Sequence, residues 1–597
     1  MEEAKELLKK LKVVSLLDLA LITPSGYNNT ALSDEIKVGE VQTFRARVDE
    51  LKSFKGKFLR VVFYLPDLKE ELVAIFFRVT SYHYDCFKVG TYHYIQGRVT
   101  QYKGQIQMSQ PKSINRVEEI IPKYSTPIKE YEIRGLIEHY ITEDALYKEG
   151  LKSKEVSVLM KLHYPKVKED IENIDIEALK FIEAFNHIKK LKGKRVDFPA
   201  LEALNGNTDE LIKQLPFILT KEQERVISDI RKDLKRKSRA TKRLIIGDVG
   251  SGKTVIILAS AVVAYPHKSI LMAPTSLLAM QIYEEAVKFM PKHIKIALVK
   301  QTNSIGDYFN ADFIIGTHAI LYKDNLPKAP LIMIDEQHRF GTKQRAMLDK
   351  MMAEGKRKPH FLQFSATPIP RTQAMMESEL IDVSLITSTP FKKDITTEII
   401  GRKDFYRLYK EIKKEILKNN QVLIVYPLVE ESTTIPYQSI DEGRGFWEKR
   451  FKNVFVTHGK DKRKEEILLE FREKGDILLA TTVVEVGISL PRLTLIVIVG
   501  AERLGLATLH QLRGRVGRLG LKSWCYLFTN DTDNFRLKSF TKTLSGFEIA
   551  KLDLKFRKSG DILDGTIQSG LEFKWLDLAE DEKIVQEAKK AIHYINY

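Results

Sequence analysis

The residues best suited to do chemistry lie in a glycine-rich stretch at 243–254, which reads Arg-Leu-Ile-Ile-Gly-Asp-Val-Gly-Ser-Gly-Lys-Thr. It satisfies the pattern G-x-x-x-x-G-K-[ST] and lies between a strand-like run and a helix-like run, a context that disfavours a glycine-rich turn beside an unrelated lysine. In such a loop, backbone amides surround phosphate oxygens, Lys253 contacts the β/γ-phosphates and the Thr254 hydroxyl holds Mg²⁺. The predicted phosphate-binding residues are Gly247, Asp248, Val249, Gly250, Ser251, Gly252, Lys253 and Thr254.

A pair of acids follows the apolar run at 331–334. An acid at the carboxyl end of a buried parallel strand lies beside the phosphate-binding loop of a doubly wound sheet. We expect Asp335 to hold the Mg²⁺ of the nucleotide and Glu336 to orient the attacking water. The next two residues, Gln337 and His338, are counted with them in the predicted nucleotide site.

A second cluster lies far downstream, at 511–518, and reads Gln-Leu-Arg-Gly-Arg-Val-Gly-Arg. Its guanidinium groups at Arg515 and Arg518 are about one helical turn apart. Guanidinium groups can stabilise the charge on a phosphoryl group during transfer, so both are predicted catalytic residues, with Gln511 as a further nucleotide contact. The alternatives are a basic surface turn and an RNA-binding Arg/Gly patch.

Just upstream of the glycine-rich loop, residues 215–223 open the same predicted domain. Thr220 is a plausible helix N-cap. Gln223 can read an adenine edge, because its amide offers both a donor and an acceptor, although a glutamine in a first helical turn is usually solvated. We include Phe217 and Gln223 among the predicted nucleotide contacts.

Short apolar runs separated by helix-like stretches position these groups. Such runs mark strands buried on both faces, which are typical of parallel α/β sheets. They form two series, and the stretch at 387–396 lies between them. The first series is at 243–246, 269–273, 312–315, 331–334 and 361–364; the second is at 422–426, 453–456, 477–480, 493–499 and 523–528.

The preceding chain has a different pattern. Five strand-like segments between 38 and 115, separated by turn residues, predict a small β-barrel with the OB-fold as the leading candidate. The segment is rich in aromatic and basic residues, so the aromatics can stack on bases or can fill the barrel core. Helical periodicity from about 130 to 200 predicts a connector between the barrel and the α/β domains.

Composition sets broad limits on the whole chain. Its 597 residues carry a net charge of +17, which suits a polyanion such as nucleic acid but also fits dispersed surface lysines. Two cysteines, Cys86 and Cys525, fall in different predicted domains, so a disulfide framework and a zinc set are excluded and a reducing cytosol fits. We expect neither a signal peptide nor a membrane span.

Further sequence motifs resemble those of one protein family. The motifs above, with Ser-Ala-Thr at 365–367 and Thr-Thr-Val-Val-Glu-Val-Gly at 481–487, look like superfamily 2 helicase motifs in their usual order. Two longer motifs are similar to motifs of the RecG family. They are Ala-Thr-Pro-Ile-Pro-Arg-Thr at 366–372 and Leu-His-Gln-Leu-Arg-Gly-Arg at the start of 509–518. That resemblance implies ATP with Mg²⁺ as cofactors and a bacterial DNA motor that unwinds forks and migrates Holliday junctions.

The resemblance also extends outside the motor. It implies that 38–112 is a wedge whose aromatics cap the branch point, with Phe77 and Tyr82 as the pair, although Tyr82 stands one place later than in the family pattern. Residues 536–570 look like a C-terminal translocation hairpin. Its implied DNA contacts are Arg536, Arg557 and Gln568.

The expected architecture is α/β, with two tandem RecA-like parallel-sheet motor domains. Its expected parts are a wedge at 1–130 with the OB-fold at 38–115, a helical linker at 131–205, helicase domain 1 at 206–388, helicase domain 2 at 389–535 and a C-terminal hairpin region at 536–597.

The resemblance implies a cytoplasmic, nucleoid-associated monomer that acts on branched DNA in recombination and repair, with single-stranded DNA-binding protein as a candidate partner. A transcription–repair coupling motor, an RNA helicase and a non-motor junction-binding protein are the alternatives.

Overall fold

The computed structural model describes most of the chain. It covers residues 2–54, 58–300, 304–323, 325–336, 340, 342–367, 369–391, 393–430, 437–482, 489–517, 520–564 and 573–594. The chain divides into two compact units, each considered by itself. The first unit contains Met1–Asn186 with Phe573–Leu576 and Glu587–Tyr597, and the second contains His187–Glu572 with Asp577–Gln586.

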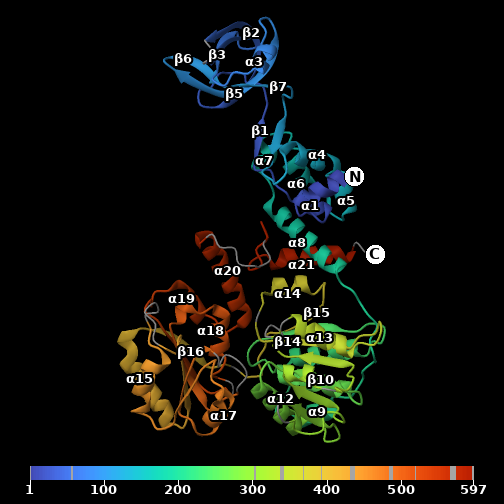
Figure 1. Cartoon of the computed structure of the whole chain (residues 1–597), viewed down its shortest axis with the longest axis vertical. Helices are drawn as coiled ribbons and strands as arrows, with labels where there is room; N and C mark the ends of the chain where they lie inside the picture. Colours follow the sequence, from blue (N-terminus) through green and yellow to red (C-terminus); the bar gives the residue numbers. More distant parts are fainter. Residues whose placement is uncertain are drawn as a thin grey trace. The chain divides into compact units, whose positions relative to one another are not determined.

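The first unit contains a closed barrel, drawn in blue in Figure 1. Its strands follow the order β2-β3-β4-β6-β5, and β2 closes on β5. The β4–β6 pair is parallel, the remaining barrel pairs are antiparallel, and α3 (Ser81–Cys86) lies in sequence between β4 and β5. This arrangement confirms the predicted OB-fold. The strands are β2 (Val41–Phe54), β3 (Phe58–Leu65), β4 (Glu70–Phe76), β5 (Tyr92–Tyr102), β6 (Gln105–Ser109) and the added β7 (Lys112–Ile114).

Alternation along the strands fills the barrel. On β2, Phe44, Ala46 and Val48 are buried, whereas Arg45 is exposed. Phe63 and Phe76 pack their rings against Phe87, at centroid distances of 5.5 and 5.4 Å. Some of the aromatic residues of the barrel therefore belong to its hydrophobic core, which was one of the two interpretations of these residues.

A ribbon and several helices complete the first unit. The ribbon pairs β1 (Gly26–Asn29) with β8 (Ile120–Lys123) in antiparallel fashion. The carboxylate of Glu183 accepts backbone N–H groups from Lys574, Trp575 and Leu576 at 2.6, 3.0 and 2.8 Å, which fastens a C-terminal segment to α8. The helices are α1 (Glu2–Lys10), α2 (Leu16–Ala20), α4 (Glu130–Tyr140), α5 (Glu143–Lys148), α6 (Ser153–His163), α7 (Glu169–Glu172), α8 (Ile176–Gly193) and α21 (Glu582–Tyr594), of which α8 and α21 cross the boundary between the units.

The second unit begins with a parallel sheet of order β11-β12-β10-β13-β14-β9-β15. It contains β9 (Lys242–Gly247), β10 (Ser269–Met272), β11 (Ile296–Val299), β12 (Phe313–Gly316), β13 (Leu331–Ile334), β14 (His360–Ser365) and β15 (Asp382–Ile386). Its helices are α9 (Asp209–Gln214), α10 (Lys221–Leu234), α11 (Lys253–Ala264), α12 (Ser276–Phe289), α13 (Thr342–Met352) and α14 (Arg371–Glu377), with the 3₁₀ helix η1 (His318–Tyr322).

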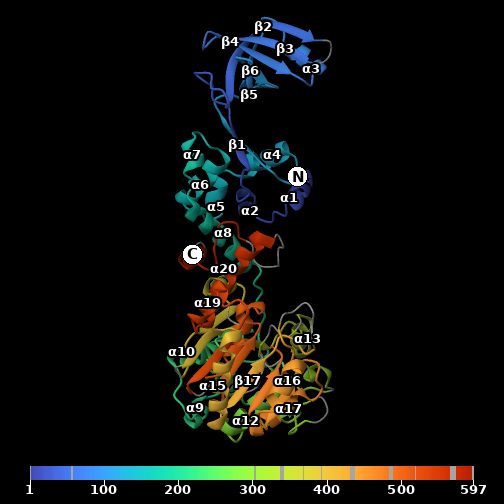
Figure 2. The ribbon, with the colours of Figure 1, turned by 90° about the vertical axis from the view of Figure 1, so that its left-hand side faces the viewer.

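A second parallel sheet follows, in the order β16-β21-β20-β17-β19-β18. Along β17, Val422 and Ile424 pack with α15 and α16 in one core, while Leu423 and Val425 belong to the core of the other face; Figure 2 shows β17 beside α15 and α16. The elements are β16 (Ile395–Ile400), β17 (Gln421–Val425), β18 (Val454–Thr457), β19 (Ile477–Ala480), β20 (Leu493–Val499), β21 (Ser523–Phe528), α15 (Phe405–Leu417), α16 (Ile440–Glu448), α17 (Lys464–Lys474), α18 (Leu506–Arg513), α19 (Phe535–Thr541) and α20 (Gly546–Asp564), with the 3₁₀ helices η3 (Arg402–Asp404) and η5 (Ala501–Arg503).

Two parallel sheets therefore stand where two series of apolar runs predicted them, and the α/β fold class is confirmed. Both cysteines are free, Cys86 being half-buried and Cys525 buried. Within the described residues, each helix is too short or too polar to cross a membrane.

Candidate nucleotide site and motor interface

The phosphate-binding loop joins the end of β9 to the start of α11. Gly250 and Gly252 have φ angles of +82° and +78°, which favour glycine. A Cβ at Gly252 would lie 2.4 Å from the amide nitrogen of Gln223, and one at Gly247 would lie 2.3 Å from the Ser251 hydroxyl oxygen. These glycines are therefore required by backbone conformation and by close packing.

Two polar groups of this loop fit a bound phosphate. The Lys253 ammonium donates to the backbone oxygens of Gly247 at 2.8 Å and Asp248 at 3.3 Å, so it lies over the loop. The Ser251 hydroxyl is fully buried and has no hydrogen-bond partner in the described structure. Thr254 lies in the first turn of α11, beside Lys253. The loop thus offers a cation and an unsatisfied hydroxyl group where triphosphate oxygens are expected.

The acids of the site lie directly after β13. Asp335 is buried, and its backbone N–H donates to Met272 on the neighbouring strand β10. Burial and the adjacent charge of Glu336 raise the pKa of Asp335 to about 7, while Lys253 opposes this rise. A buried carboxylate of this kind fits a bound cation, which would compensate its charge. The described residues contain no group of three metal-binding side chains.

Glu336 adopts a left-handed backbone conformation, with φ of +48°. Its carboxylate accepts the backbone N–H of Ala366 at 3.0 Å, which holds it against the 365–367 segment after β14. Gln337 and His338, predicted to belong to the same site, lie outside the described residues.

Gln223 lies at the loop, but its amide is engaged with the protein. Its oxygen accepts the backbone N–H of Thr220 at 2.8 Å, and its nitrogen donates to the backbone oxygen of Ser251 at 2.8 Å. The predicted N-cap at Thr220 is present. Phe217 packs, partly buried, against the core of the first sheet. Adenine recognition by Gln223 and Phe217 thus stays a prediction.

Helix α18 brings the downstream arginine cluster against the first sheet. The Gln511 side chain donates to the Thr367 hydroxyl at 3.1 Å, next to the segment held by Glu336. A Cβ at Gly514 would lie 2.5 Å from a methyl group of Val249, so this glycine packs directly on the phosphate-binding loop. Arg515 is 9% exposed, and Arg518 lies outside the described residues.

Asp248 connects the loop to three distant segments. Its carboxylate accepts the Nε2 proton of His510 in α18 at 2.5 Å and the backbone N–H of Gly546, the first residue of α20, at 3.0 Å. The Lys393 ammonium is 3.5 Å away. Burial raises the pKa of Asp248, but His510 and Lys393 outweigh this effect and hold it below the ordinary range. Sequence reasoning missed these partners, because no local spacing relates residues 262 positions apart.

Arg513 connects the same helix to the C-terminal hairpin. Its guanidinium donates to the backbone oxygens of Phe540 at 3.2 Å and Thr543 at 2.8 Å, and lies 4.0 Å from the centre of the Phe540 ring. Burial lowers the pKa of Arg513 to about 10, so the group remains charged at neutral pH. Sequence reasoning missed this role of Arg513, because its burial and its backbone partners become visible only in the folded chain.

The structure describes the side chains of some of the predicted DNA contacts but not of others. Phe77 and Tyr82 are 57% and 58% exposed on the barrel, which suits contact with a base pair. The Arg536 side chain donates to the backbone oxygen of Glu502. Arg557 belongs to α20, but the structure does not describe its side chain, and Gln568 lies outside the described residues.

The two parallel sheets carry a phosphate-binding loop, a pair of acids and an arginine cluster. Together these features define a superfamily 2 helicase motor. The DEAD/DEAH box helicase family matches residues 220–376, and the helicase conserved C-terminal domain matches 405–520.

The chain is 43% identical to the ATP-dependent DNA helicase RecG of Helicobacter pylori strain ATCC 700392 / 26695, over 99% of this chain and 98% of that protein. It is 32% identical to RecG of Aquifex aeolicus, over 98% and 82%. A solved structure of RecG bound to a three-way DNA junction matches 98% of this chain and 84% of its own, with 29% identity and a TM-score of 0.54. The chain belongs to the RecG family of ATP-dependent DNA helicases.

Proposed function

We propose that this helicase uses ATP to move along duplex DNA and to remodel branched DNA at stalled forks and four-way junctions during recombination and repair. The observation that carries the proposal is the bonding of Asp248, which joins the phosphate-binding loop to α18 and to the first residue of α20. A motor that must convert hydrolysis into movement needs such a connection. The similar structure contains a three-way DNA junction, which supports the choice of branched DNA. Family membership favours this function over an RNA helicase and a non-motor junction binder.

The residues divide the chemistry between the two sheets. Bound ATP with Mg²⁺ would supply the phosphoryl group and the metal charge that phosphoryl transfer requires. The loop and Lys253 would hold the phosphates, Thr254 and Asp335 would hold the metal, and Glu336 would orient water. Arg515 and Arg518 would stabilise charge on the phosphoryl group.

Movement would then pass to DNA through the hairpin and the barrel. Because Gln511 contacts Thr367 and His510 contacts Asp248, a change at the nucleotide moves α18 relative to the first sheet. Arg513 would transmit that movement to α19 and α20, and Arg536, Arg557 and Gln568 would engage the duplex. Phe77 and Tyr82 would cap the last base pair at the branch point.

The remaining expectations are part of the same proposal. We propose the domain boundaries expected above; a change-over at 388/389 is supported by its position between the end of β15 and the start of β16. We further propose a monomer that works on the bacterial nucleoid and meets single-stranded DNA-binding protein at forks. Sedimentation with and without that protein would test the monomeric state and the complex. A stable dimer would contradict the first, and an absence of complex would contradict the second.

The direct test compares ATP hydrolysis with duplex, single-stranded, forked and four-way DNA at one stated salt concentration, since phosphate contacts make binding salt-dependent. We expect the branched substrates to stimulate hydrolysis most. Lys253→Ala should abolish stimulated hydrolysis and leave junction binding intact, because Lys253 contacts phosphate and not DNA. Turnover that persists in Lys253→Ala, or equal stimulation by RNA, would contradict the proposal.

A further inference from the structure

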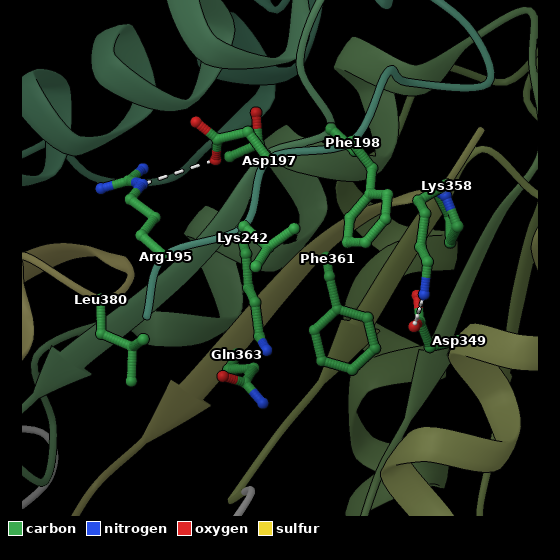
Figure 3. A pocket seen from close by; sticks show the side chains of 13 residues that line it. Arg195, Asp197, Phe198, Lys242, Asp349, Lys358, Phe361, Gln363 and Leu380 are labelled. Carbon is green, nitrogen blue, oxygen red and sulfur yellow. Dashed lines mark hydrogen bonds and ion pairs between the residues drawn. The ribbon is translucent and has the colours of Figure 1, made fainter. Parts of the chain in front are cut away.

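A cavity lies at the opposite end of strand β9 from the phosphate-binding loop. Its volume is about 400 Å³. Lys242 begins β9, whereas Gly247 ends it at the nucleotide site, so the cavity and the loop flank opposite ends of the same strand. Figure 3 shows side chains from the 195–198 segment, from β9 and β14 and from α13 converging on this space.

Two of the cations around the cavity are already paired. Arg195 donates to Asp382 at 3.0 Å, and the Lys358 ammonium lies 2.7 Å from the Asp349 carboxylate. Lys242 differs from them, because no described residue forms a hydrogen bond or an ion pair with its side chain. Lys242 is exposed, so its ammonium group is solvated and is available to pair with an anion in the cavity.

Gln363 supplies a second unsatisfied group. It lies inside β14 between strands β13 and β9, and its side chain is only 6% exposed. No described residue forms a hydrogen bond with its amide, which in Figure 3 lies beside the Lys242 side chain and within the cavity. The amide atoms are accessible from the cavity and are not sealed from solvent, so they are available to a ligand; central strands of parallel sheets usually carry apolar side chains at such positions. This position is explained if a ligand satisfies the amide.

The rest of the wall is apolar. Phe198 and Phe361 stand above and beside the two polar groups, and Leu380 lies on the other side (Figure 3). Aromatic and aliphatic walls hold a flat or apolar body, while a few convergent polar groups fix its orientation. The Lys242 ammonium can pair with one negative charge. The Gln363 amide N–H beside it can donate to the same anion, so the two groups together suit a carboxylate.

We propose that this cavity is a binding site for a small carboxylate with an aromatic or apolar body. Lys242 and the Gln363 amide bind the carboxylate, and Phe198, Phe361 and Leu380 enclose the body. The site is separate from nucleotide binding and does not depend on the proposed action on DNA.

The experiment titrates the full-length protein with naphthoate, with naphthalenemethanol as the neutral counterpart of equal shape, and with inorganic phosphate, using calorimetry and ligand-observed NMR. We expect saturable naphthoate binding that saturating ATP does not displace. Binding of the alcohol should be weaker by about tenfold, because it loses the charge-assisted contact. Phosphate should not compete, because it lacks the apolar body.

Variants locate the binding. Lys242→Met should weaken naphthoate binding by about tenfold, and Gln363→Met should weaken it too, since each removes a contact to the carboxylate. Lys237→Met is the matched control, because Lys237 is an exposed lysine paired with Glu202 outside the cavity. Thermal unfolding checks that each variant is folded. The proposal is overturned if naphthoate does not bind, if the alcohol or phosphate binds equally well, if ATP displaces naphthoate, or if Lys242→Met binds as the wild type does.

Discussion

Asp248 is the residue through which the phosphate-binding loop contacts the rest of the motor. A variable position of the loop pattern carries a buried carboxylate with partners in α18, in α20 and at Lys393. The glycine-rich pattern was sufficient to place the loop and Lys253, and the apolar run at 331–334 was sufficient to place Asp335 after a strand, because these positions follow from local spacing. The partners of Asp248 depend on tertiary packing and could not be predicted from the sequence.

Asp248→Asn tests this connection. The amide keeps the size of the carboxylate but loses its charge, which leaves Lys393 buried without an anion. We expect DNA stimulation of ATP hydrolysis to fall by about tenfold while nucleotide binding changes little. Glu224→Gln, an exposed acid-to-amide change in α10, is the control. Stimulation equal to the wild type in Asp248→Asn would show that the contact is not used.

The raised pKa of Asp335 predicts that folding stability depends on pH. Its pKa is raised above the unfolded value, so the folded protein without nucleotide holds a proton on this carboxyl group more tightly than the unfolded chain does. The contribution of Asp335 to folding stability therefore decreases as the pH rises from about 4 to about 7.

The same proton competes with Mg²⁺. We expect the affinity for Mg-ATP, measured by calorimetry, to fall as the pH drops below about 7, because a protonated carboxyl group is a poor metal ligand. Asp335→Asn should bind Mg-ATP weakly at every pH. An affinity of the wild type that is constant across this range would contradict the role of Asp335.

At the scale of elements, the central strands of the two parallel sheets were predictable, as was the edge strand β18 at 453–456, but the other three edge strands were not. Runs such as 331–334 and 477–480 are buried throughout and became β13 and β19. In the two parallel sheets the strands missed were β11, β15 and β16, and each lies at an edge of its sheet. Strands β15 and β16 carry polar residues such as Asp382 and Glu398, so they lack a continuous apolar run. Polar residues do not explain the omission of β11, which is apolar throughout.

Helix α6 offers a second pH test in the other unit. His163 is buried; its Nε2 proton is donated to the backbone oxygen of Ala20 at 2.8 Å, and its Nδ1 accepts the Tyr124 hydroxyl at 2.8 Å. Burial lowers the pKa of His163 to about 4, so the folded protein binds this proton less tightly than the unfolded chain does. Stability is therefore fully present above about pH 6.5 and is lost as the pH falls towards 4, by up to about 3 kcal/mol.

Hydrogen exchange of α6, corrected for the intrinsic pH dependence, measures this loss as a decrease in the free energy of local opening. A His163→Gln variant cannot titrate and should lack the pH-dependent part, although it is less stable at neutral pH. Equal pH dependence in both proteins would mean that another group is responsible.

At the scale of the whole molecule, each unit has a task that its own structure supports. The barrel exposes Phe77 and Tyr82, and the second unit joins two parallel sheets to a hairpin through α18. Local patterns in the sequence were sufficient to predict the barrel and the two parallel sheets, whereas the hairpin was expected only from the family resemblance. The sequence could not predict how Arg513 connects α18 to the hairpin, since that contact joins a side chain to backbone oxygens about 30 residues away.

The central claim is that hydrolysis in the motor drives movement along duplex DNA through this connection. Displacement of a third strand from a triplex measures the movement, and phosphate release in the same reaction measures hydrolysis. The variant is Arg513→Lys, which keeps the charge but cannot bond both backbone oxygens in the same geometry. Arg444→Lys, at an exposed site in α16, is the control.

We predict that Arg513→Lys hydrolyses ATP within about threefold of the wild-type rate but displaces the third strand at least about tenfold more slowly, because the hairpin no longer follows α18. Wild-type displacement by Arg513→Lys, or displacement that falls only in proportion to hydrolysis, would contradict the claim.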